Sequence, residues 1–224
     1  MRASLMPPHA WPRIAPFAAY MAFVVLADLL ARAGWAAPSL LWLYPLKIAA
    51  VVVLLLCYRR HYAELAAGRP RWRELWLALA AGVLVLVLWL HLDADWMVMG
   101  TSPGYQPLEQ GRLHWPLLLV RLAGGVLVVP LMEELFWRSF LLRWISAPDF
   151  LAQSPAAVTL RAFVVAALLF GVEHQLWLAG VVAGAVYSGL YMYSRNLWTP
   201  ILAHAITNGG LGLWIIATGN WTYW

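Results

Sequence analysis

Several ionisable and amide side chains lie inside long apolar stretches of this chain. Two adjacent glutamates, Glu133 and Glu134, interrupt one stretch, His174 ends a second, and His204 and Asn208 lie four residues apart in a third. An ionisable side chain at the centre of a bilayer costs about 2.5–3.5 kcal/mol by insertion scales, so such residues are rare and suggest function. These five side chains are therefore the candidates for a functional centre.

The composition is that of a membrane protein. Of the 224 residues, 63% are hydrophobic and 11% are charged, and the mean hydropathy is +0.72, whereas soluble domains carry roughly 25% charged residues. The net charge of +5 comes with five arginines crowded into one short loop: Arg59, Arg60, Arg69, Arg71 and Arg73. This placement is typical of the positive-inside pattern of membrane proteins and argues against a nucleic-acid partner.

The apolar runs predict an all-α fold, a polytopic membrane helix bundle with about seven transmembrane helices (six to eight). A spanning helix needs about 20 apolar residues, and Pro38 and Pro116 fit the first turns of two such helices. We expect one membrane domain over 1–224, with the candidate site in its second half at 114–218. The predicted spans are roughly 14–33, 38–57, 74–92, 114–145, 158–174, 176–194 and 197–218.

The arginines also predict the orientation. Arg2 and Arg13 place the N-terminus in the cytoplasm, and the arginine-rich loop 58–73 follows on the same side after two spans. The acidic loop 91–114 and the uncharged C-terminal segment 219–224 then lie outside. We expect a multi-pass cell-membrane protein, with a bacterial inner membrane as the compartment.

Helix geometry predicts that the candidate side chains share a depth. With ~1.5 Å of rise per residue, Glu133 lies ~18 Å, His174 ~21 Å, His204 ~10 Å and Asn208 ~17 Å from the cytoplasmic ends of their helices. Three helices thus bring polar groups to similar depths, which favours a single centre.

The two glutamates are expected to differ. Glu134 lies four residues before Arg138, a spacing that suits an ion pair on one helix face. Glu133 points roughly 100° away and needs another partner. No chemical role is assigned to three other charged residues. Asp28 and Lys47 are expected to pair with each other, and Glu173 is expected to face water or headgroups.

The residue types suit acyl transfer to water. A glutamate can act as general base on a water that a histidine positions, while His204 and Asn208 donate hydrogen bonds to an oxyanion. A zinc site with Glu133, His174 and His204 as ligands is an alternative. A serine nucleophile lacks its Gly-x-Ser-x-Gly turn, and Cys57 is interpreted as a plain helix residue.

Two non-enzymatic functions are also possible interpretations of the sequence. Intramembrane glutamate and histidine can form a proton or ion path in a transporter, although no repeated halves are visible. A non-catalytic immunity or scaffold membrane protein is the other.

The polar residues form three motifs in order along the chain: Glu133-Glu134-x-x-x-Arg138, Phe170-x-x-x-His174 and His204-x-x-x-Asn208. These motifs resemble those of the CAAX protease and bacteriocin-processing (CPBP) intramembrane protease family, which includes the type II CAAX prenyl endopeptidases. The short, Trp-rich chain also resembles a bacterial branch that is related to CAAX proteases and associated with exosortases.

This resemblance implies an intramembrane, glutamate-dependent endopeptidase. Glu133 would activate water with help from His174, and His204 and Asn208 would form the oxyanion hole. The substrate would be a membrane-associated protein or peptide, with or without a lipid anchor.

The resemblance also implies that no metal or other cofactor takes part, which disfavours the zinc alternative. Glu134, Arg138 and Phe170 would support the site.

Overall fold

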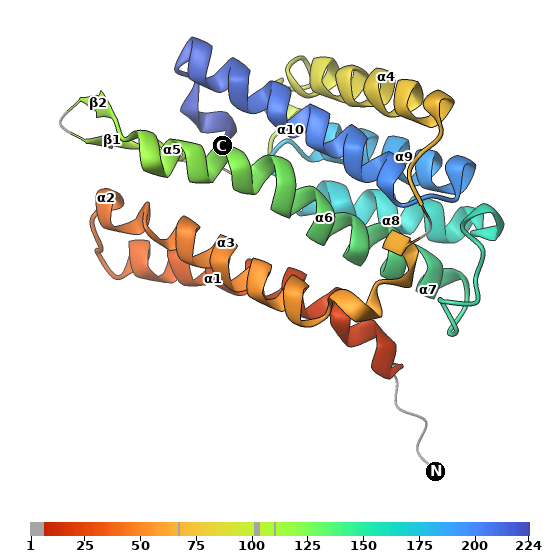
Figure 1. Ribbon diagram of the computed structural model, residues 1–224. Coiled ribbons are helices and arrows are strands. Elements are labelled where there is room, and N and C mark those ends of the chain that lie inside the picture. Colours follow the sequence, from red (N-terminus) through yellow and green to blue (C-terminus); the bar gives the residue numbers. More distant parts are fainter. Residues whose placement is uncertain (1–6, 67, 101–103, 110) are drawn as a thin grey trace.

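The computed structural model describes residues 7–66, 68–100, 104–109 and 111–224 and is mostly helical, with almost no strand (Figure 1). Arg2, which was used to predict the orientation, lies outside the described residues. The α-helices are α1 (Trp11–Arg32), α2 (Ala37–Leu40), α3 (Leu43–Cys57), α4 (Trp72–Trp89), α5 (Trp115–Ala123), α6 (Val129–Glu134), α7 (Leu142–Ser146), α8 (Leu160–Val172), α9 (Trp177–Ser194) and α10 (Trp198–Thr218).

Shorter elements connect these helices. Two π-helical segments, η5 (Gly124–Val128) and η6 (Leu135–Leu141), join α5, α6 and α7 into one long helix. The two short strands β1 (Leu108–Glu109) and β2 (Arg112–Leu113) pair antiparallel in the predicted loop 91–114. The 3-10 turns are η1 (Pro8–Ala10), η2 (Arg59–His61), η3 (Ala63–Ala66), η4 (Asp95–Met97), η7 (Pro155–Ala157) and η8 (Trp221–Tyr223).

The predicted all-α membrane bundle is confirmed. Among the described residues, five helical segments are long and apolar enough to cross a bilayer. The other two predicted spans correspond to α8, an apolar helix of 13 residues, and α9, a helix of 18 residues. Pro38 and Pro116 lie in the first turns of α2 and α5, as predicted.

The bundle is built from packed helix pairs. α1 packs on α3, α4 on α10, and α8 on α9, while the long α5–α7 helix contacts both α1 and α10. Figure 1 shows this long helix between the α1–α3 pair and the α4–α10 pair. The start of α1, the loop after α3 and the α9–α10 turn lie at one end of the bundle, and the β1–β2 hairpin lies at the other.

Glycines allow the closest of these contacts. A Cβ atom added at Gly82 of α4 would lie 2.6 Å from the carbonyl oxygen of Ala203 in α10. At Gly171 of α8 an added Cβ would collide with Val181 and the Trp177 carbonyl of α9. Membrane helices associate largely through such close van der Waals packing, because burial from lipid gives no hydrophobic gain.

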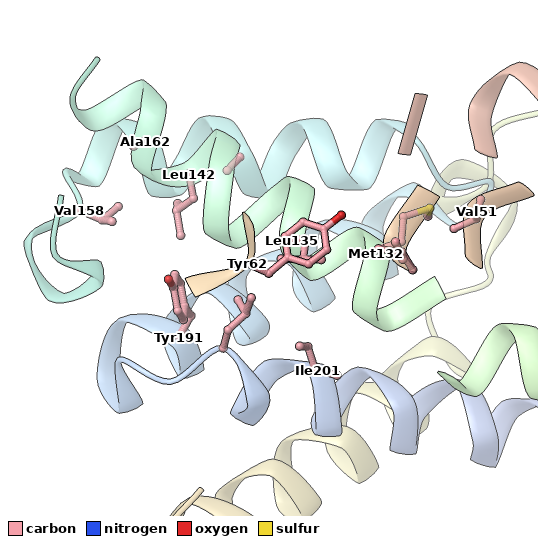
Figure 2. Close-up of a cluster of buried hydrophobic side chains, with 12 residues drawn as sticks. Val51, Tyr62, Met132, Leu135, Leu142, Val158, Ala162, Tyr191 and Ile201 are labelled. Atoms are coloured by element: carbon pink, nitrogen blue, oxygen red, sulfur yellow. The ribbon is translucent and has the colours of Figure 1, made fainter. Parts of the chain in front are cut away.

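The largest buried cluster surrounds the glutamate-bearing helix. Met132 and Leu135, on either side of the two glutamates, are 0% and 1% exposed. They pack in one cluster with Val51 of α3, Tyr191 of α9 and Ile201 of α10 (Figure 2). The helix that carries Glu133 and Glu134 is therefore fixed by apolar contacts on its other faces.

A buried polar cluster that the sequence did not predict joins α1 to the rest of the bundle. Arg13 of α1, whose side chain is fully buried, forms an ion pair with Glu64 of the loop after α3 at 2.6 Å. Ser139 of η6 donates a hydrogen bond to the same carboxylate, and Arg143 donates to Ser139 Oγ at 2.8 Å. The loop is thereby tied to two separate helices.

The charge state of Glu64 matters for this cluster. Burial alone would raise the pKa of its carboxyl, but hydrogen bonds and charge from Arg13, together with the hydrogen bond from Ser139, outweigh burial and lower the pKa. A group whose pKa is lower in the folded state stabilises that state above its unfolded pKa, which is about 4.3 for glutamate. This stabilisation is lost as the pH falls through the folded pKa.

Glu64→Gln should therefore destabilise the protein by about 3–5 kcal/mol at neutral pH, because it leaves Arg13 buried without its counter-charge. Thermal unfolding in detergent at pH 7 and at a series of pH values below about 4.3 measures this. The difference between wild type and variant should shrink as the pH falls through the lowered pKa of Glu64 in the folded state. Glu109→Gln, at a carboxylate that is 74% exposed, is the matched control. An unchanged melting temperature for Glu64→Gln at pH 7 would contradict the anchoring role.

Candidate active site

The Glu134 carboxylate is held between two helices in the bundle interior. Arg138 Nη1 donates to Glu134 Oε1 at 3.1 Å, and His204 Nδ1 of α10 lies 2.9 Å from the same oxygen. The Glu134 and Arg138 side chains are 0% and 1% exposed. The predicted Glu134–Arg138 ion pair is confirmed, and its link to His204 joins the α5–α7 helix to α10.

Glu133 differs from its neighbour, as expected. Its residue is 5% exposed, it forms no hydrogen bond with any described residue, and its Oε2 atom is buried without a partner. A buried carboxyl group without a hydrogen bond is costly and calls for an explanation. Oε2 of Glu134 is also buried without a partner, but Oε1 of Glu134 is bonded to Arg138 and His204. Glu133 is therefore the glutamate of the two whose carboxyl group has no hydrogen bond to a described residue.

The structure brings the four predicted catalytic side chains to one cavity. Its volume is about 790 Å³, and Glu133 of α6, His174 after α8, and His204 and Asn208 of α10 all line it. Glu134 is absent from the lining. The three motifs, which are separate in the sequence, thus meet at one cavity, with polar groups contributed by α6, α10 and the turn after α8.

One of the two ring nitrogens of His174 is already hydrogen-bonded, and the other is free. Its Nδ1 atom lies 2.7 Å from the carbonyl oxygen of Phe170, one helical turn earlier. Because a carbonyl only accepts, Nδ1 is the protonated nitrogen, and Nε2 keeps a lone pair. The ring can therefore accept a hydrogen bond from a water through Nε2.

Phe170 supports two of these groups by packing. Its ring centroid lies 4.7 Å from that of His174, and the Arg138 guanidinium carbon lies 4.3 Å from the Phe170 centroid. A guanidinium over an aromatic face is favourable where water is excluded. The supporting position expected for Phe170 is consistent with these contacts.

Asn208 is oriented by an irregularity in the facing helix. In the π-helical segment η5, the Val129 N–H donates to the Gly124 carbonyl, five residues back. The next residue is Pro130, which has no N–H, so the Gly125 carbonyl lacks a backbone donor. Asn208 Nδ2 donates to that carbonyl at 2.9 Å, which fixes its amide and leaves its second N–H available.

The His204 ring is held in place by stacking and by a hydrogen bond at Nδ1. Its ring stacks on Tyr187 with centroids 5.1 Å apart, and Tyr187 in turn donates to Thr207 Oγ1 at 2.7 Å. Because the Glu134 carboxylate only accepts, Nδ1 of His204 is a donor. The other nitrogen, Nε2, donates a hydrogen bond when the ring carries both protons.

Three charged side chains lie elsewhere than predicted. Glu173 lines the cavity and accepts from Trp137 Nε1 at 3.1 Å, so the expectation that it faces water or headgroups is wrong. Asp28 pairs with Arg32, its neighbour one turn on, at 2.8 Å. Lys47 instead lies with its Nζ 3.8 Å from the ring centroid of Tyr20, so the expected Asp28–Lys47 pair is absent.

Sequence reasoning also missed a cationic part of the cavity wall. Arg121 and Lys47 both line the cavity, and Arg121 lies over the rings of Tyr44 and Tyr105 at 4.4 and 5.4 Å. Both residues interrupt apolar runs, which is the same signal that identified Glu133. Their aromatic partners, from distant parts of the chain, explain how the bundle accommodates them.

The alternatives to a glutamate base find less support in the geometry. No three His, Cys, Asp or Glu side chains of the described residues gather as a metal-binding group. No serine or cysteine of the described residues lines the cavity. Ser139 belongs to the Glu64 cluster, and Cys57 is exposed at the end of α3.

One comparison with known proteins matches the part of the chain that carries the motifs. The family model described as type II CAAX prenyl endopeptidase Rce1-like matches residues 115–210. No curated protein and no solved structure matches the chain. The predicted resemblance is thereby confirmed, and residues 115–210 of this chain are similar to the Rce1-like type II CAAX prenyl endopeptidases.

Proposed function

We propose that this multi-pass membrane protein is an endopeptidase that hydrolyses a peptide bond in a membrane-associated protein or peptide. One observation carries the proposal. Glu133, a buried carboxylate without a hydrogen bond to the described residues, lines one cavity with His174, His204 and Asn208. The family match supports an intramembrane endopeptidase in general terms, and the residue roles below are inferred from the geometry.

Glu133 acts as the general base. It takes a proton from a water that donates its other hydrogen to His174 Nε2, and the resulting hydroxide attacks the carbonyl carbon of the scissile bond. When the C–N bond breaks, Glu133 returns the proton to the departing amine. His174 suits the positioning role because its Nδ1 is already occupied by the Phe170 carbonyl.

His204 and Asn208 stabilise the oxyanion. The second N–H of the Asn208 amide is one donor, and the His204 ring is the other when its Nε2 carries a proton. Both side chains are held in place by other contacts. Donors fixed before reaction stabilise developing charge without a cost of reorganisation. Glu134 contributes by fixing His204 and does not itself touch the substrate.

The substrate follows from where the cavity lies. Part of its lining comes from α1, α3, α4, the α5–α7 helix and α10, which are apolar enough to cross a bilayer, and the rest from α8, α9 and loop residues. A membrane-associated peptide segment is therefore the natural ligand. The name of the matched family points to prenylated peptides, and such a peptide is the first probe to use. A bacterial inner membrane, with the N-terminus in the cytoplasm, remains the proposed setting.

Glu133→Gln should abolish cleavage, with a loss of about 10²–10⁴-fold. The assay uses the full chain in nanodiscs with a farnesylated, fluorescence-quenched C-terminal peptide. In parallel, mass spectrometry of new peptide termini in membranes that express each variant extends the test to other substrates. Glu109→Gln, outside the cavity, should cleave like wild type. Cleavage retained by Glu133→Gln would sink the mechanism.

Chelation should leave the activity unchanged if no metal takes part. The wild-type protein is treated with EDTA and 1,10-phenanthroline, dialysed, and assayed on the same peptide; the rate should stay within about twofold of the untreated enzyme, far less than the several kcal/mol that a catalytic metal supplies. A loss of cleavage that added Zn²⁺ restores would replace the glutamate-only mechanism by a metal site.

A further inference from the structure

A second hollow lies at the end of the bundle where α1 starts. Its volume is about 510 Å³, and it shares no lining residue with the cavity of Glu133. Four arginines line it: Arg69, Arg71 and Arg73 before and within the start of α4, and Arg195 at the end of α9. We call this feature the arginine hollow.

The positive charge of the arginine hollow is compensated only in part, because four arginines face one carboxylate. Glu74 is the one carboxylate in its lining, and Glu74 Oε2 accepts a hydrogen bond from the Arg71 backbone N–H at 2.8 Å. Among the described residues, none of the four arginines forms an ion pair. Like charges gathered in one concave surface repel one another and attract anions.

The hollow is assembled from two distant parts of the chain by a buried amide. Asn196, which is 8% exposed, donates from Nδ2 to the Gly68 carbonyl at 3.3 Å. Its Oδ1 accepts from the Trp198 backbone N–H at 3.0 Å. Asn196 therefore holds the start of α10 against the loop that carries Arg69, and the arginines are brought together by a built contact.

The backbone of Arg195 is strained. Its φ of 56° makes it the one non-glycine residue with a positive φ among the described residues. Glycine is the usual residue at such a helix end, and Gly219 occupies the equivalent position after α10 with a φ of 71°. An arginine at a backbone position that favours glycine suggests a function for its side chain.

The surroundings match the headgroup level of a bilayer. Trp72 and Trp76, at the start of α4, are 71% and 55% exposed, and exposed tryptophans at helix ends gather at the membrane–water interface. Arginine binds phosphate through paired hydrogen bonds. Clusters of basic residues next to a membrane helix attract anionic lipids of the cytoplasmic leaflet.

We propose that the arginine hollow binds the phosphate of an anionic phospholipid headgroup, held by Arg195 together with Arg69, Arg71 and Arg73. The lipid would bridge the start of α4 and the α9–α10 turn. This site is separate from the proposed peptidase chemistry and does not depend on it.

Arg195→Gly tests the proposal because it should have opposite effects on lipid binding and on the fold. Removing one phosphate contact should weaken binding of phosphatidylglycerol about fivefold. Replacing a strained residue by glycine should leave the melting temperature without lipid unchanged or raise it. Native mass spectrometry of the detergent-solubilised full chain, titrated with phosphatidylglycerol or phosphatidylcholine, measures the binding.

The matched control is Arg161→Gln, an exposed arginine near the start of α8 that does not line the hollow. It should bind phosphatidylglycerol like wild type. Equal affinity of the wild type for the two lipids, or an equal loss in both variants, would overturn the proposal.

Two competition arms separate the sources of the anion. Inorganic phosphate at millimolar concentration should compete only weakly with the lipid. A result in which phosphate alone, or an acidic peptide, displaces phosphatidylglycerol completely would assign the hollow to a soluble anion or to a protein segment and overturn the lipid assignment.

Discussion

The arrangement of the cavity depends on one buried carboxylate. Glu134 accepts from Arg138 one turn along its own helix and lies 2.9 Å from Nδ1 of His204 on α10. Charged groups this deep are tolerated only when they are paired and hydrogen-bonded, and then removing one partner is costly. The contact sets the rotation of the α5–α7 helix relative to α10. That rotation decides which neighbouring side chains reach the cavity.

The position of the Glu133 side chain in the cavity follows from that contact. Because Glu134 points toward Arg138, the adjacent side chain is turned away and lines the cavity with His174, His204 and Asn208. The π-helical segment η5 and Pro130 complete the arrangement, since they leave the Gly125 carbonyl for Asn208 to bind. Two residues of the same type, next to each other in the sequence, thus have different contacts because their surroundings differ.

Much of this was predictable from the sequence, and the missing parts share a physical reason. Polar residues in apolar runs identified the helices, the Glu134–Arg138 pair and the side chains that line the cavity, because helical spacing and the cost of buried charge act locally. Partners across the bundle were not predictable. The Arg13–Glu64 pair and the Trp137–Glu173 hydrogen bond join residues 51 and 36 positions apart. The π-helical segments were not predicted either, because no residue pattern marks where a helix accommodates one extra residue.

The separation of roles between the two glutamates can be measured without knowing the substrate. Thermal unfolding of purified Glu133→Gln and Glu134→Gln is compared with wild type in the same detergent. Glu134→Gln should lose about 3–5 kcal/mol, because Arg138 stays buried without its counter-charge. Glu133→Gln should unfold at or above the wild-type temperature, because it removes a buried carboxylate that no described residue hydrogen-bonds. Equal destabilisation by the two substitutions would contradict the assignment of Glu133 as the free base and Glu134 as the structural ion.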